Sequence, residues 1–330
     1  MTDIRLSRRS FMSLTAGAGV VLASPAILRA APYATQPIKI VVGTGPSGTT
    51  DLSARLIAPI LKEVLGQPVI VENRPGAGST HAVGLVAGSK PDGHTLHVST
   101  AAALAVHATN VEKPADLVHD LQPIGMICDG AYIYTINKQV PAKTAKEFIT
   151  LVRNRPGEYR FGGSGPGSAL HLSGELFCQR TGTKMEVVHY NNAALRATDL
   201  LANQIQMGLG GIAVLGQYVN AGDLTAFLVA SRKREELLPN TPTSVELGIP
   251  DLDRITNWFG LHGPKDMPEQ VTEQVGAALK KALADPEVRR VLQAGGMQIP
   301  EDTPAGFLAR MEEDYKILVE VSTAGNIRIE

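Results

Sequence analysis

Two short stretches rich in glycine and hydroxyl side chains are the parts of this sequence best suited to binding a small anion. The first is GTGPSGTTD at residues 43–51, and the second is GGSGPGS at residues 162–168. Each stands between an apolar run typical of a strand and a segment with helical spacing of its apolar residues. Free backbone N–H groups and the positive end of the helix dipole both attract anions at such a junction. The sequence therefore predicts an anion-binding loop at each place.

The first stretch also matches the dinucleotide-binding pattern G-x-G-x-x-G at residues 43–48. A strand-like run precedes it, a helix-like segment follows it, and Glu72 ends the next apolar run, which is the context that the pattern requires. Asp51 argues against a dinucleotide, because it would add negative charge beside the pyrophosphate. A P-loop is less favoured still, since Thr49 stands where that motif needs lysine. We favour a simple anion, and an exported nicotinamide or flavin oxidoreductase is the alternative.

The side chains offer no visible catalytic apparatus. The eight histidines lack the spacing of metal ligands, and the second stretch does not complete the nucleophile pattern G-x-S-x-G. His171 could touch Ser168, but a pair without an orienting acid is more typical of helix capping than of catalysis. Cys128 and Cys178 could form a disulfide or remain two buried thiols. We expect no enzyme activity, no cofactor and no metal.

The N-terminus has the features of an export signal. SRRSFM at residues 7–12 contains a twin arginine, a mildly apolar stretch follows to residue 28, and alanines at positions 30 and 31 suggest a cleavage site. We expect residues 1–30 to direct export by the twin-arginine pathway to the periplasm. Their removal takes away four arginines and one aspartate, which changes the formal net charge from −1 to −4. The low aromatic content and the lack of a basic patch argue against nucleic acid, and we expect no insertion into a membrane.

The order of strand-like and helix-like segments predicts an α/β fold with two lobes. Apolar runs that alternate with helical segments over residues 38–100 are typical of a parallel sheet with its loops at the carboxyl edge. The long apolar run at 124–136 predicts a crossing into a second lobe, and WFGLH at 258–262 predicts the return. Trp258 would line the hinge or cleft, or belong to the core. We expect lobe 1 to comprise residues 37–131 and 255–330, lobe 2 to comprise residues 132–254, and a ligand to close them by hinge motion.

Six sequence blocks together resemble the extracytoplasmic solute receptors of the tripartite tricarboxylate transporter family, often called Bug proteins. They are GTTD at 48–51, LGQPVIVENRPGAG at 65–78, PDGHTL at 91–96, GELF at 174–177, WFGL at 258–261 and ALADPEVR at 282–289. The resemblance covers essentially the whole chain after the signal. It implies a type II periplasmic-binding-protein fold with two crossover hinge strands. It also implies a receptor, usually a monomer, that captures a small carboxylate and works with membrane transporter subunits; a signalling receptor would have the same binding fold.

The resemblance further implies that the ligand lies between the two glycine-rich loops, held by backbone amides, hydroxyls and bridging water. Carried over by position, the expected contacts are Gly45, Pro46, Ser47, Gly48 and Thr49 in lobe 1, Ser164, Gly165, Gly167 and Ser168 in lobe 2, and Ser99, Thr100, Tyr190 and Asn191 as walls.

The chain departs from the usual family pattern in three places. The first loop usually reads PFPPGG, YKGG becomes YNNA at residues 190–193, and two acids that are common further on become Gln206 and Gly210. A buried ammonium group needs a carboxylate partner, and none is evident among the expected contacts. We therefore expect a carboxylate without an amino group, with Gly210 leaving room for bulk unless that position lies behind the cleft.

Overall fold

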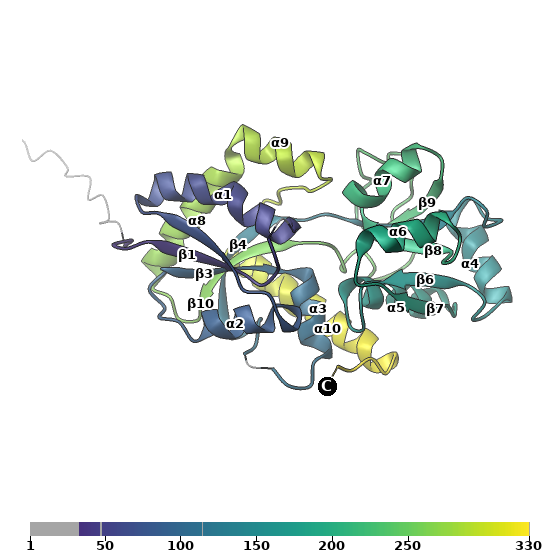
Figure 1. Ribbon diagram of the computed structural model, residues 1–330, viewed down its shortest axis with the longest axis horizontal. Coiled ribbons are helices and arrows are strands. Elements are labelled where there is room, and N and C mark those ends of the chain that lie inside the picture. Colours follow the sequence, from purple (N-terminus) through teal and green to yellow (C-terminus); the bar gives the residue numbers. More distant parts are fainter. Residues whose placement is uncertain (1–32, 47, 114, 330) are drawn as a thin grey trace, which may run out of the picture. The chain divides into compact units, whose positions relative to one another are not determined.

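Two five-stranded sheets organise the chain in the computed structural model, which describes residues 33–46, 48–113 and 115–329 (Figure 1). The predicted export signal and Ser47 lie outside these ranges. The first sheet has the order β2-β1-β3-β10-β4 and consists of β1 (Ile38–Val42), β2 (Val69–Asn73), β3 (Thr95–Thr100), β4 (Leu121–Cys128) and β10 (Phe259–Pro264). The second has the order β7-β6-β8-β5-β9 and consists of β5 (Tyr132–Asn137), β6 (Arg160–Gly163), β7 (Glu186–His189), β8 (Met207–Gly211) and β9 (Leu224–Val229). We call the parts built on these sheets lobe 1 and lobe 2; the predicted α/β fold is confirmed.

Helices follow most of the strands. Those that pack on sheet 1 are α1 (Thr49–Leu65), α2 (Thr80–Ala87), α3 (Ala101–Thr109), α8 (Glu269–Ala284), α9 (Pro286–Ala294) and α10 (Pro304–Ala324), together with the short 3-10 turn η1 (Ala77–Ser79). Those in lobe 2 are α4 (Ala145–Asn154), α5 (Ala169–Thr181), α6 (Ala193–Leu201) and α7 (Ile212–Asn220). Within the described part of the chain, no helix combines the length and the hydropathy needed to cross a bilayer.

The strand β1 is apolar because both faces of its sheet are covered. Ile40 and Val42 belong to a buried cluster with Ile57 of α1 and with side chains of α8. Val41 points the other way, into a cluster that includes α2, α3 and α10. The parallel pairing of β1 with β2 and β3 then brings the loops after these strands to one edge of the sheet.

Lobe 2 has an aromatic core that continues into lobe 1. Five ring pairs among Tyr134, Phe148, Phe177 and Phe227 have centroids between 5.1 and 6.5 Å apart. The same buried cluster includes Phe307 of α10 and side chains of α3. Helix α10 therefore contributes to the core on both sides of the crossings.

The chain passes between the sheets after β4 and again just before β10. The two crossing segments are joined by the N–H of Asn257, which donates to the carbonyl of Gly130 (2.8 Å). The return crossing ends earlier than the sequence predicts, because Phe259 already begins β10, which lies antiparallel between β3 and β4. Trp258 is 0% exposed and its ring centroid lies 5.2 Å from that of Phe307. Of the alternatives that the sequence left open for Trp258, the core position is the one observed.

Cys128 and Cys178 are buried thiols that form no disulfide. Cys128 ends β4 in lobe 1, whereas Cys178 lies in α5 of lobe 2. Burial raises the pKa of each thiol to about 12. Of the two alternatives that the sequence left open, the pair of buried thiols is the one observed.

Candidate functional site

The lobe-1 loop leads directly from β1 into α1. The Ser79 hydroxyl donates to the carbonyl of Gly43 (3.2 Å), and a Cβ at Gly43 would lie 2.4 Å from the Cβ of Ser79. Only glycine fits at this close approach. Gly48 is the N-cap residue of α1 and supplies no side-chain capping bond. The first turn of α1 therefore meets the loop with the positive end of its dipole and without a capping oxygen from that residue.

A polar network braces this loop from behind. Asp51 is buried, and both of its carboxylate oxygens accept from Arg55 Nε at 2.9 and 3.0 Å. The Asn73 amide donates to Asp51 Oδ1 (2.9 Å) and to the carbonyl of Thr44 (3.0 Å). The charge of Asp51 is thus compensated by Arg55, and the network holds the loop against the end of β2. Of the predicted lobe-1 contacts, Pro46 and Thr49 are exposed, whereas Gly45 and Gly48 are partly buried.

The lobe-2 loop leads from β6 into α5 and is held by its own residues. The Ser168 hydroxyl caps α5 by accepting from the N–H of His171 and from the N–H of Ser164, both at 3.3 Å. The N–H of Gly167 donates to His171 Nδ1 (3.1 Å). The predicted capping relation between Ser168 and His171 is confirmed. The backbone N–H groups of Ser164 and Gly167 therefore have partners within the loop itself.

The lobe-2 loop also approaches lobe 1. Gly165 and Gly167 have φ angles of +112° and +66°, which favour glycine. A Cβ at Gly167 would lie 2.4 Å from Thr109 Oγ1 at the end of α3. Ser164 is exposed, and Gly165 is partly buried.

Three of the predicted wall residues use their hydroxyl groups within their own lobes. Ser99 is 1% exposed, and its hydroxyl lies 3.0 Å from His262 Nδ1 inside lobe 1. Thr100 Oγ1 accepts from the N–H of Ala103 (3.0 Å) and caps α3. The Tyr190 hydroxyl donates to Asp199 Oδ2 (2.8 Å).

Asn191 and Gly210 are the remaining predicted contacts, and Gln206 is the other substituted acid position. Asn191 is exposed at the start of the turn into α6. Gly210 lies within β8, where an added Cβ would lie 3.3 Å from Leu215 of α7, so this glycine opens no cavity. Gln206 stands before β8, at the amino end of that strand, and its Oε1 accepts from the N–H of Arg160 (3.1 Å).

One charged residue near these loops was not predicted. Arg196 in α6 is 8% exposed, and no hydrogen bond or ion pair joins its guanidinium group to any part of the chain that the structure describes. Burial lowers its pKa, while Tyr132 and Tyr190 lie close enough to act on its charge. The neighbouring Leu195 is 52% exposed. The sequence carried no signal for this inversion of a buried arginine and an exposed leucine, because it arises from the packing of α6.

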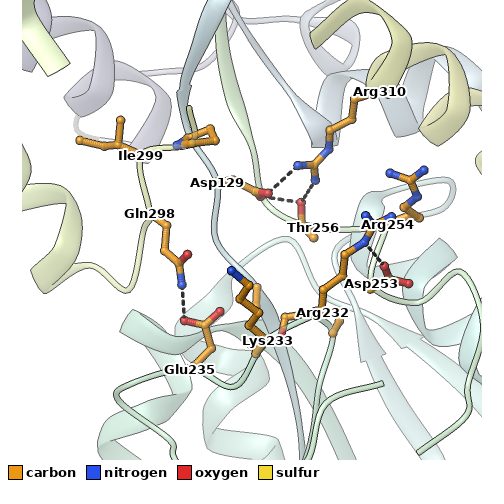
Figure 2. Close-up of a pocket in the computed structure, with 14 residues that line it drawn as sticks. Asp129, Arg232, Lys233, Glu235, Asp253, Arg254, Thr256, Gln298, Ile299 and Arg310 are labelled. Atoms are coloured by element: carbon orange, nitrogen blue, oxygen red, sulfur yellow. Dashed lines mark hydrogen bonds and ion pairs between the residues drawn. The ribbon is translucent and has the colours of Figure 1, made fainter. Parts of the chain in front are cut away.

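A separate cavity of about 300 Å³ lies beside the two crossings (Figure 2). Arg310 of α10 donates to Asp129 Oδ2 (2.7 Å) and to Thr256 Oγ1 (2.6 Å), so one side chain joins both crossing segments. Gln298 Nε2 donates to Glu235 Oε2 (3.0 Å) across the cavity. We call this feature the hinge pocket.

Ion pairs compensate most of the charge that lines the hinge pocket. Arg232 pairs with Asp253 (2.9 Å), and Arg254 pairs with Glu313 of α10. Figure 2 shows Lys233 directed into the space between these groups. The pocket is lined by residues on both sides of the crossings, so any change in the angle between the lobes would alter it.

Two α/β sheets, two crossings between them and a glycine-rich strand-to-helix loop on each sheet define the class of two-lobed periplasmic binding proteins. The model of the family described as "Tripartite tricarboxylate transporter family receptor" matches residues 53–312. The chain belongs to this family of solute-binding receptors.

Individual relatives agree with this assignment. The chain is 30% identical over 305 residues to Protein BugT of Bordetella pertussis, covering 90% of this chain and 93% of BugT. MatC of Rhodopseudomonas palustris, solved with bound malate, is similar with a TM-score of 0.71 and 27% identity, over 87% of this chain and 99% of MatC. R. palustris Rpa4515 with adipate is similar with a TM-score of 0.73 and 26% identity, over 89% of this chain and 98% of that protein.

Proposed function

We propose that this protein is a periplasmic receptor that captures a small carboxylate between the loops at residues 43–49 and 163–168. The observation that carries the proposal is the pair of strand-to-helix loops, one on each sheet, which end at the N-termini of α1 and α5. Such termini attract carboxylates through their N–H groups and dipoles. The malate and adipate found with two structural relatives support this ligand class.

The site residues that carry this proposal are a subset of those predicted. Gly45, Pro46, Gly48 and Thr49 form the lobe-1 side, together with Ser47, which lies outside the described residues. Gly165 and the capped start of α5 at Ser168 form the lobe-2 side. The crossings just after β4 and just before β10 would act as the hinge, with lobe 1 at 37–131 and 255–330 and lobe 2 at 132–254.

We propose that the captured ligand is passed to the membrane subunits of a tripartite tricarboxylate-type transporter, and that the protein acts as a monomer without enzyme activity. Residues 1–30 would direct its export by the twin-arginine pathway. Replacing Arg8 and Arg9 with lysine should keep the protein in the cytoplasm, and undiminished export of that variant would contradict this pathway.

A thermal-shift screen tests the ligand class. Mono-, di- and tricarboxylates are compared with neutral amides such as succinamide and with NAD and FAD. A ligand at 100 times its dissociation constant adds about 2.7 kcal/mol to the free energy of unfolding. For a chain of this size this raises the melting temperature by roughly 4 °C. Stabilisation by a nucleotide and by no carboxylate would contradict the proposal and favour the oxidoreductase alternative.

A further inference from the structure

Arg196 stands where the carboxyl ends of several strands of sheet 2 meet. Tyr132 begins β5 and pairs with Gly211 at the end of β8. Tyr190 follows β7, and a Cβ on Gly162 near the end of β6 would lie 2.8 Å from Cγ and Cδ of Arg196. Ligands of open α/β sheets bind outside this edge. The arginine therefore belongs to the same edge of lobe 2 as the glycine-rich loop.

The charge of Arg196 has no counter-ion among the described residues. Arg310, by contrast, lies 2.7 Å from Asp129 and 3.5 Å from Asp314. Asp199, three positions after Arg196 in α6, instead accepts from the Tyr190 hydroxyl. Arg196 is 8% exposed, so burial removes much of the water around this unpaired cation without supplying a partner, while its guanidinium nitrogens still meet solvent.

Tyr132 adds a hydrogen-bond donor beside this charge. Its side chain is buried, and no hydrogen bond from its hydroxyl to the described part of the chain is found. Burial raises the pKa of this phenol above its ordinary value, so it stays a neutral donor. Guanidinium and phenol groups together suit a carboxylate, which arginine binds through two parallel hydrogen bonds.

We propose that Arg196 and Tyr132 form a subsite for a second carboxylate, and that the ligand of this receptor is therefore a dicarboxylate. This inference rests on the proposed function, in which the loop at residues 43–49 takes the first carboxylate. A ligand ammonium group near Arg196 would be repelled, so succinate binds more tightly than aspartate.

Calorimetric titration of Arg196→Met and Arg196→Lys tests the subsite. Methionine keeps an apolar stem against Gly162, and lysine keeps the charge. Arg196→Met should bind succinate and adipate at least about tenfold more weakly than wild type, because a hydrogen-bonded charge is lost. Its affinity for butyrate should change little. The succinate affinity of Arg196→Lys should lie between those of wild type and Arg196→Met, and Tyr132→Phe should bind succinate several-fold more weakly than wild type. Arg155→Met, at an exposed arginine of the same lobe, is the control and should match wild type.

The melting temperature without ligand separates a binding role from a structural one. Removal of an unpaired buried charge should leave the melting temperature of Arg196→Met equal to that of wild type or higher. Unchanged succinate affinity in this variant overturns the subsite and leaves the proposed function intact. Equal losses for butyrate and succinate together with a lower melting temperature overturn it as well. If wild type binds no carboxylate at all, the proposed function and the subsite both fail.

Discussion

Replacement of Asp314 by asparagine tests the charge network that joins α10 to the hinge. Asp314 is 2% exposed, and its Oδ2 accepts from Trp258 Nε1 (3.0 Å) and lies 3.5 Å from Arg310 Nε. Burial raises its pKa from 3.8 to about 6, against the opposing effects of Arg310 and of the Trp258 hydrogen bond. Asp129 raises this pKa further, and Arg254 lowers it.

The direction of the pH effect follows from these two values. Because the pKa is higher in the folded than in the unfolded state, the folded protein holds an extra proton between about pH 4 and 6. The free energy of unfolding therefore falls as the pH rises through this range. At pH 7.5, the gap between a pKa of 3.8 in the unfolded state and about 6 in the folded state lowers the free energy of unfolding by about 3 kcal/mol. About 2 kcal/mol of that cost accumulates between pH 4.5 and 7.5.

Urea denaturation of wild type and Asp314→Asn at several pH values measures this cost. Asparagine can still accept from Trp258 but carries no charge, so its stability relative to wild type should rise by about 2 kcal/mol from pH 4.5 to 7.5. The corresponding change in melting temperature is roughly 3 °C. Asp223→Asn, at an exposed ion pair with Lys138, is the control and should show no comparable trend. A relative stability of Asp314→Asn that falls as the pH rises would show that Arg310 favours the charged carboxylate, and would refute the reasoning.

Three further predictions concern the brace, the core and the thiols. Asn73→Ala should weaken succinate binding about tenfold by calorimetry, because Asn73 holds the lobe-1 loop through Thr44 and Asp51. Asn154→Ala is the control, and equal succinate affinities of the two variants would contradict this prediction. Gly174→Ala should lower the free energy of unfolding by about 1–3 kcal/mol, since its Cβ would lie 2.2 Å from the Phe161 ring. Gly276→Ala in α8 is the control and should not, because the nearest atom to its Cβ would be 3.9 Å away. Cys128 and Cys178 should be inert to Ellman's reagent at pH 8 and yield two thiols after unfolding; rapid reaction of the native protein would show that they are accessible.

The two glycine-rich loops could be predicted because their signal is local. A run of glycine and hydroxyl residues between a strand pattern and a helix pattern specifies a strand-to-helix junction without reference to the rest of the chain. The fold class could be predicted from the order of such patterns. Helix α3 was missed because AAALAVHAT is apolar on all sides, and α7 because IAVLGQYVN lacks a clear polar face.

The orientation of single side chains could not be predicted, because it depends on partners far along the chain. Ser99 turns toward His262, 163 positions later, because of the pairing of β3 with β10. The Tyr190 hydroxyl reaches Asp199 because α6 packs against sheet 2. Arg196 appears as an ordinary helical arginine in the sequence, and its burial arises from β5, β6 and the residue after β7. Side-chain chemistry at such positions is decided by tertiary packing rather than by a local pattern.

The central claim is that a small carboxylate binds between the loops at residues 43–49 and 163–168. Amide NMR spectra of glycine- and serine-labelled protein, recorded during titration with succinate, test it most directly. The account predicts that the signals of Gly45, Gly48 and Gly165 shift along one saturable curve. The signal of Ser231, which lines the hinge pocket, should shift only as the lobes close, and that of Gly222, exposed in the turn before β9, should change little. Shifts confined to Ser231 and its surroundings, with the loop signals unmoved at saturation, would place the ligand in the hinge pocket and contradict the account.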